Sequence, residues 1–167
     1  MGGDRATFDR VFPLLTILGR RILHTGPLGS ASTLKVMTNY LATANLLTCC
    51  EALVTMKAAG LDLATTYEAI RISSGTSFVH ETESQMILNG CRDINFTMDL
   101  AVKDLGFAMA YGRDLGVPLA LAGLTSETFD RARADVALVA GSTEPLRNQA
   151  YGVISRRQIE SGVRYRF

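Results

Sequence analysis

Cysteine and histidine are too few and too scattered in this sequence to build a disulfide framework or a metal centre. The chain has three cysteines and two histidines. Cys49 and Cys50 are adjacent, so on a helix their side chains diverge, and Cys91 lies far from both. No Cys-x-x-Cys pair or zinc-type Cys/His spacing is present. The sequence therefore predicts no metal site and no disulfide, which fits a reducing compartment.

An excess of charge of one sign is also lacking. Seventeen Lys and Arg residues balance 16 Asp and Glu residues, and the formal net charge is +1. The basic residues are spread along the chain, whereas nucleic acid or an acidic membrane calls for a basic patch. Neither is therefore expected as a partner. No basic segment followed by an apolar run opens the chain, so a cytoplasmic location is expected.

Strand alternation is absent as well, and helical spacing of apolar residues takes its place. Of the 167 residues 47% are hydrophobic and 20% are charged. A chain of this length is typically one folded domain, because about 150 residues bury roughly 70% of their unfolded surface. Apolar positions recur every three to four residues, so an all-α fold, a multi-helix bundle, is predicted. The expected helices are residues 5–20, 33–59, 63–73, 76–88, 97–115, 119–138 and 144–161.

Residues 33–59 are predicted to form one long central helix. No glycine or proline interrupts them, and apolar residues occur on every side, which indicates burial on every side. A membrane span is the alternative, but Asn45 and Glu51 are costly in lipid. At 1.5 Å per residue, about 27 residues extend roughly 40 Å, more than one small domain covers. The surplus apolar surface favours a partner subunit, in a homodimer or a higher homo-oligomer.

The segment with the most chemistry is residues 24–39, HTGPLGSASTLKVMTN. A turn built on glycine and proline leads into a helix, on which Lys35 and Asn39 lie four residues apart and so share one face. Lys supplies donors and a transferable proton, and Asn can hold the amine in place. Such a pair can act on a carbonyl or alcohol oxygen as general acid and base. The alternative is a solvated lysine beside a capping or packing asparagine.

A second charged pair, Lys103 and Asp104, interrupts an apolar helical pattern within residues 97–115. Adjacent helical positions point about 100° apart, so the two charges cannot both be buried in one site. The alternative to a functional role is that Lys103 is exposed and Asp104 belongs to a surface pair.

These motifs together resemble the helical domain of the β-hydroxyacid dehydrogenases, the 3-hydroxyisobutyrate dehydrogenase family. The family pattern H-x-G-x-x-G-x-G-x-x-x-K-x-x-x-N matches residues 24–39 except at Ala31, where the family usually has glycine. Ala31 predicts a turn that is less open or differently shaped than in relatives. The resemblance continues in Gly2-Gly3-Asp4, Glu51-Ala-Leu, Ala59-Gly60-Leu-Asp62, Ser73-Ser74-Gly75 and residues 96–106, which fit F-x-x-x-L-x-x-K-D-L-G.

The resemblance implies a bundle like the C-terminal domain of 6-phosphogluconate dehydrogenase, without the N-terminal Rossmann domain. Residues 1–28 would be a junction helix and strand remnant of the cofactor domain, and residues 29–167 the C-terminal helical substrate and dimerisation domain. The sequence has no strand followed by G-x-G-x-x-G, so NAD or NADP would be held mostly by a missing domain. Lys103, with Asp104 beside it, would lie near that cofactor.

The resemblance also assigns roles in hydride transfer to or from a small β-hydroxyacid or semialdehyde. Lys35 would be the catalytic acid and base, and Asn39 would orient the substrate or the lysine. Ser30 and Phe96 would line the substrate cleft, although Ser30 equally suits a helix cap and Phe96 a core position. The alternative function is a non-catalytic helical oligomerisation module, in which Lys35 is a surface residue.

Overall fold

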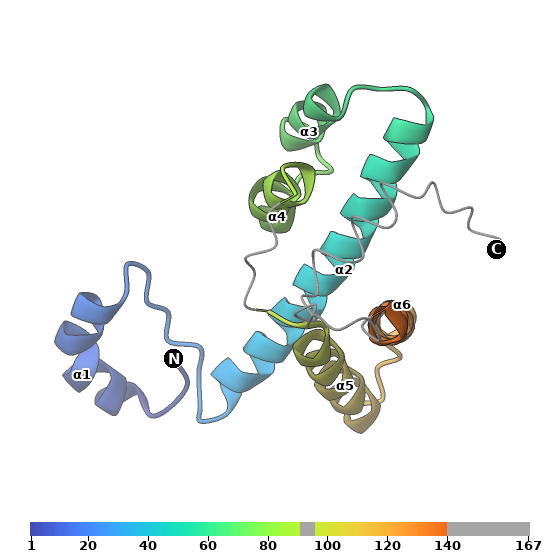
Figure 1. Ribbon diagram of the computed structural model, residues 1–167. Helices are drawn as coiled ribbons and strands as arrows, with labels where there is room; N and C mark the ends of the chain where they lie inside the picture. Colours follow the sequence, from blue (N-terminus) through green and yellow to red (C-terminus); the bar gives the residue numbers. More distant parts are fainter. Residues whose placement is uncertain (91–95, 140–167) are drawn as a thin grey trace. The chain divides into compact units, whose positions relative to one another are not determined.

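The computed structural model describes residues 1–90 and 96–139, which are helical and contain no β-strand (Figure 1). The predicted all-α class is therefore confirmed. The helix expected at residues 144–161 lies outside the described residues. The helices within the described residues are α1 (Arg5–Leu18), α2 (Ser30–Ala58), α3 (Leu63–Arg71), α4 (Phe78–Leu88), α5 (Met98–Asp114) and α6 (Ala120–Val139).

The chain divides into two compact units, Met1–Asn39 and Tyr40–Phe167, and the boundary falls within α2. In the first unit, Asp4 caps α1 by accepting a hydrogen bond from the Thr7 amide at 2.8 Å. Residues 22–25 form neither a helix nor a strand. His24 lies with its ring 4.9 Å from that of Phe8, and its Nε2 donates to the Gly3 carbonyl at 2.8 Å.

Helix α2 begins at Ser30, three residues before the predicted start at residue 33. The Ser30 amide donates to the Pro27 carbonyl at 3.1 Å, and the Thr33 amide donates to the Gly29 carbonyl at 3.1 Å. Gly29 has a φ of +94°, a conformation that glycine adopts without a steric penalty. This glycine lets the chain turn directly into the helix, so Ser30, which also suited a helix cap, is its first residue.

The expectation that this central helix is buried on every side is not met within one chain. Leu34, Leu41 and Met56 of α2 are all exposed. The short helices α3 and α4 are too small to wrap a helix of 29 residues. Among the described residues, no helix is both long and apolar enough to cross a membrane. The exposed residues of α2 therefore remain apolar surface on this chain.

The core of the second unit joins four of its helices. Helices α5 and α6 lie side by side (Figure 1). Both contribute residues to one buried hydrophobic cluster, to which α2 and α4 also contribute. Phe129 of α6 is fully buried in it. The buried members are Leu46, Cys50, Val79, Met98, Ala101, Leu105 and Phe129.

A buried polar cluster links α2, α3 and α4. The Nε2 of His80 lies 3.0 Å from the Tyr67 carbonyl, which can only accept, so Nε2 carries the proton and Nδ1 is an acceptor. That Nδ1 lies 3.2 Å from Cys49 Sγ and 3.1 Å from Ser84 Oγ. Burial raises the pKa of the Cys49 thiol, so it remains protonated. The cluster stabilises the junction of three helices, because each of its polar side chains has a partner inside the protein.

Asp62 makes the start of α3 sensitive to acid. Its Oδ2 accepts from the Thr65 amide at 2.7 Å and from the Thr65 hydroxyl at 2.8 Å. These hydrogen bonds lower the pKa of Asp62 from 3.8. A carboxyl whose pKa is lower in the folded state stabilises it above the unfolded pKa, and this stability is lost as the pH falls through the folded pKa.

We therefore expect Asp62→Asn, which caps a helix without titrating, to gain stability relative to the wild type as the pH falls from 7 to 3. Urea unfolding at the two pH values measures this difference. An unchanged difference between the two proteins would show that the Asp62 carboxylate does not link α3 to pH.

Candidate functional site

Lys35 and Asn39 lie one helical turn apart near the start of α2, as the sequence predicts. Both belong to the first unit, Lys35 exposed and Asn39 half-buried. Residues four apart on a helix share a face. An amine and a carboxamide therefore project together from the first turns of α2, where they can act jointly on one oxygen atom of a ligand.

The turn before α2 is packed closely against the first residues of the chain. The Gly3 amide donates to the Gly26 carbonyl at 2.8 Å, and the Thr25 amide donates to the Met1 carbonyl at 2.9 Å. A Cβ added at Gly2 would lie 2.7 Å from Ser30 Oγ and 2.9 Å from the Pro27 carbonyl oxygen. Glycine at position 2 therefore allows the chain to pass this close to Ser30 and Pro27, where a side chain would clash.

Gly2→Ala is expected to destabilise this turn by about 1–3 kcal/mol, because the new methyl group overlaps backbone that cannot move away easily. Faster hydrogen exchange of the Thr25 amide, which bonds the Met1 carbonyl, measures the loss. Gly106→Ala in α5 is the control, because an added Cβ meets nothing within 4 Å there. Unchanged exchange in Gly2→Ala would contradict the close packing.

The side chain of Ser30, the first residue of α2, is held in place by the hydroxyl of Thr25. Its Oγ lies 2.8 Å from Thr25 Oγ1, and Thr25 Oγ1 in turn donates to the Met1 carbonyl at 3.0 Å. Ser30 is half-buried. Sequence reasoning singled out Ser30 but missed Thr25, because nothing in the sequence indicates a contact between the start of the chain and the turn.

The other predicted site residues, Phe96, Lys103 and Asp104, lie in the second unit. The Lys103 side chain is 53% exposed and that of Asp104 is 4% exposed, and Nζ lies 3.7 Å from Oδ1. Lys103 is therefore exposed, as the alternative expected, and Asp104 pairs with it, but Asp104 is buried rather than at the surface. Asp104 falls on the same face of α5 as Ala101 and Ala108, which are fully buried. Phe96 packs against the core cluster.

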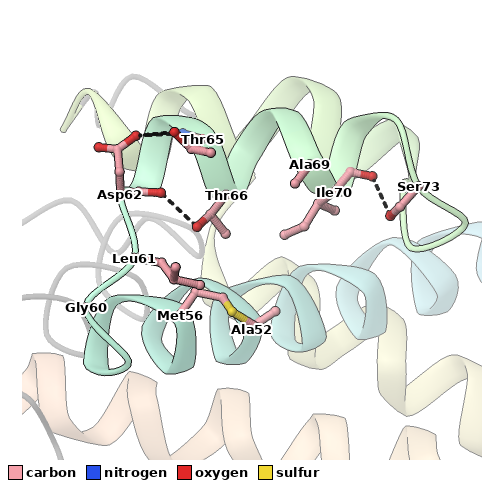
Figure 2. Close-up of a pocket in the computed structure, with 10 residues that line it drawn as sticks. All are labelled: Ala52, Met56, Gly60, Leu61, Asp62, Thr65, Thr66, Ala69, Ile70 and Ser73. Carbon is pink, nitrogen blue, oxygen red and sulfur yellow. Dashed lines mark hydrogen bonds between the residues drawn. The ribbon is translucent and has the colours of Figure 1, made fainter.

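A groove that the sequence did not predict lies between the second half of α2 and α3 (Figure 2). Its volume is about 580 Å³. The hydroxyl groups on its walls bond within α3 and its flanking residues: Thr66 donates to the Asp62 carbonyl and Ser73 to the Ile70 carbonyl. The groove therefore presents mostly carbon. Its lining residues, none of them a predicted site residue, are Ala52, Met56, Gly60, Leu61, Asp62, Thr65, Thr66, Ala69, Ile70 and Ser73.

Comparisons with known proteins agree with the motifs. The model of the family described as "NAD-binding of NADP-dependent 3-hydroxyisobutyrate dehydrogenase" matches residues 29–147. The chain is 34% identical to 2-(hydroxymethyl)glutarate dehydrogenase from Eubacterium barkeri, over 80% of this chain and 45% of that protein. It is 31% identical to 3-sulfolactaldehyde reductase from Escherichia coli (strain K12), again over 80% of this chain and 45% of that protein.

Solved structures show the same architecture. The 3-hydroxyisobutyrate dehydrogenase from Salmonella typhimurium aligns with a TM-score of 0.75 and 25% identity, over 92% of this chain and 51% of that one. The Mycobacterium tuberculosis 3-hydroxyisobutyrate dehydrogenase aligns with a TM-score of 0.77 and 22% identity, over 93% and 52%, and shows the fold alone.

The fold and the motifs define an all-α domain of the kind found in hydroxyacid dehydrogenases. The chain belongs to the 3-hydroxyisobutyrate dehydrogenase family of NAD(P)-dependent oxidoreductases, as its motifs predicted. It spans about half the length of the relatives that it matches.

Proposed function

We propose that this chain is the helical half of an enzyme that transfers hydride between a nicotinamide cofactor and a small β-hydroxyacid or semialdehyde. Residues 1–28 would join it to a cofactor domain, and residues 29–167 would form the substrate and dimerisation domain. The observation that carries the proposal is the Lys35 and Asn39 pair on the first turns of α2, within the segment that the family model matches.

In this proposal Lys35 handles the proton of the reaction. A bound nicotinamide would supply the acceptor or donor of hydride. During oxidation of the alcohol, the hydroxyl proton would pass to the unprotonated amine of Lys35 as the carbon loses hydride and the C=O bond forms. In the reverse direction Lys35 returns the proton to the oxygen. Asn39, one turn further along α2, orients the oxygen or the amine.

The residues present fit part of a dinucleotide. The exposed Lys103 ammonium can meet a phosphate or another acceptor, and Oδ1 of the buried Asp104 lies 3.7 Å from its Nζ. The chain has no glycine fingerprint for a pyrophosphate. A second domain would therefore bind most of the cofactor and would select NAD or NADP. We propose a cytoplasmic location for the enzyme.

The experiment that tests this function is to sequence the reading frame upstream of the Met1 codon and to assay the whole product. A strand followed by G-x-G-x-x-G in frame, with turnover of a small β-hydroxyacid in the presence of NAD or NADP, would support the proposal. A stop codon that closes the frame, or a complete product without turnover, would count against it.

The apolar groove and the exposed Leu41 and Met56 support a homodimer, under the dehydrogenase function and also under the alternative of a non-catalytic oligomerisation module. We expect sedimentation at micromolar concentration to give a dimer or a higher homo-oligomer, and a monomer would contradict this. The two functions differ in cofactor binding, because the complete dehydrogenase, unlike an oligomerisation module, should change the fluorescence of a reduced nicotinamide.

A further inference from the structure

A chain of hydrogen bonds at the start of α2 has a fixed direction. Thr25 Oγ1 lies 3.0 Å from the Met1 carbonyl oxygen and 2.8 Å from Ser30 Oγ. A carbonyl oxygen only accepts, and a threonine hydroxyl has one proton. If Thr25 gave that proton to Ser30, its own oxygen would face the carbonyl with no hydrogen between them. Both contacts are hydrogen bonds only when Thr25 donates to Met1 and Ser30 donates to Thr25.

The direction of these bonds decides what Ser30 can offer to a ligand. Its single proton is committed to Thr25, so only lone pairs of Oγ remain. The backbone confines the hydroxyl as well, since a Cβ added at Gly2 would lie 2.7 Å from Oγ and one added at Gly26 would lie 3.7 Å away. Ser30 contributes no other hydrogen bond from its side chain among the described contacts. Toward a ligand it is therefore an acceptor.

We propose that Thr25 is a positioning residue that makes Ser30 an acceptor for a hydrogen-bond donor of the substrate, such as a second hydroxyl or an amine. This inference rests on the proposed function and on the place in the substrate cleft that the family resemblance implies for Ser30. A carboxylate or an ether oxygen placed against Ser30 would meet another acceptor and would be disfavoured. Thr25 thus sets the preferred substrate class through Ser30 without touching the reacting atoms.

Neutron diffraction from deuterated crystals of this chain tests the direction of the bonds independently of catalysis. We expect the deuteron of Thr25 Oγ1 to point at the Met1 carbonyl oxygen and that of Ser30 Oγ to point at Thr25. A Thr25 deuteron that points at Ser30 would overturn the proposal, because Ser30 could then donate to a ligand.

The complete enzyme tests the consequence for substrates. The probes are glycerate, whose second hydroxyl donates, and its 2-O-methyl ether, which only accepts. In Thr25→Val the Ser30 proton is released, so the ratio of kcat/KM for glycerate to that for the ether should fall about tenfold. Thr25→Ser keeps the hydroxyl and should preserve the wild-type ratio.

The ratio separates positioning from a structural role, because a disturbed turn lowers kcat/KM for both compounds equally. An unchanged ratio in Thr25→Val would overturn the proposal. Failure of the wild-type enzyme to oxidise either compound or any other β-hydroxyacid would refute the dehydrogenase function instead, and the deuteron positions would still decide the direction of the hydrogen bonds.

Discussion

Lys35→Ala in the complete enzyme is expected to lower turnover by about 10²- to 10⁴-fold, the usual contribution of a general acid or base. The loss should fall on kcat, since the lysine acts on a proton that moves only during the chemical step. The fold should survive, because Lys35 is exposed on the first turns of α2 and exposed substitutions usually change stability by at most about 0.5 kcal/mol.

Steady-state kinetics and urea unfolding of the same preparations separate these effects. Lys57→Ala is the matched control, since Lys57 is an exposed lysine in the last turn of the same helix. It should keep turnover close to that of the wild type. Retained turnover in Lys35→Ala would remove Lys35 from the acid and base role, and equal losses in both variants would indicate a general effect of charge.

Local signals explain why the helix ends were predicted well. Asp62 caps α3 because its carboxylate reaches the Thr65 amide three residues away, and Gly60 follows the end of α2 with a φ of +82°. Both effects involve neighbours in sequence, so the residue types around each helix end are enough to predict them. The start of α2 was missed by three residues because the Gly29 turn passes straight into the helix, and the hydroxyl residues there resemble caps.

Contacts between distant residues could not be predicted in the same way. Cys49 meets Ser84, 35 positions away, and one isolated histidine gives no sign of the polar cluster that it completes. The hydroxyl contacts of Thr25 are equally hidden, since Met1 lies 24 positions away. Such contacts depend on how the segments pack, which periodicity does not describe.

The candidate site shows the same division. The spacing of Lys35 and Asn39 is a property of one helix, so the sequence places them together. Lys103 and Asp104 are adjacent on a helix and so point about 100° apart, which means that only one of them can face the core. The apolar positions 101, 105 and 108 indicate which one, because Asp104 lies between them on the buried face of α5. The apolar pattern therefore contained the answer, although the surface-pair alternative ignored it.

Phe129→Ala is expected to destabilise the second unit by about 3–5 kcal/mol, the cost of losing a fully buried aromatic side chain and leaving a cavity. Phe129 is 0% exposed and belongs to a cluster with residues of α2, α4 and α5. A small protein is stable by only about 5–15 kcal/mol. The substitution should therefore lower the midpoint of urea unfolding markedly, or leave the unit unfolded at 37 °C.

Phe107→Ala is the matched control, because Phe107 on α5 is 55% exposed. It should change the unfolding free energy by no more than about 0.5 kcal/mol when both proteins are compared in the same oligomeric state. Equal effects of the two substitutions would show that the core does not depend on α6. A large effect of Phe129→Ala alone would show that α6 stabilises α5, the helix that presents Lys103 and buries Asp104. The proposed contact of Lys103 with the cofactor would then depend on a stable core, because the core holds α5 in place.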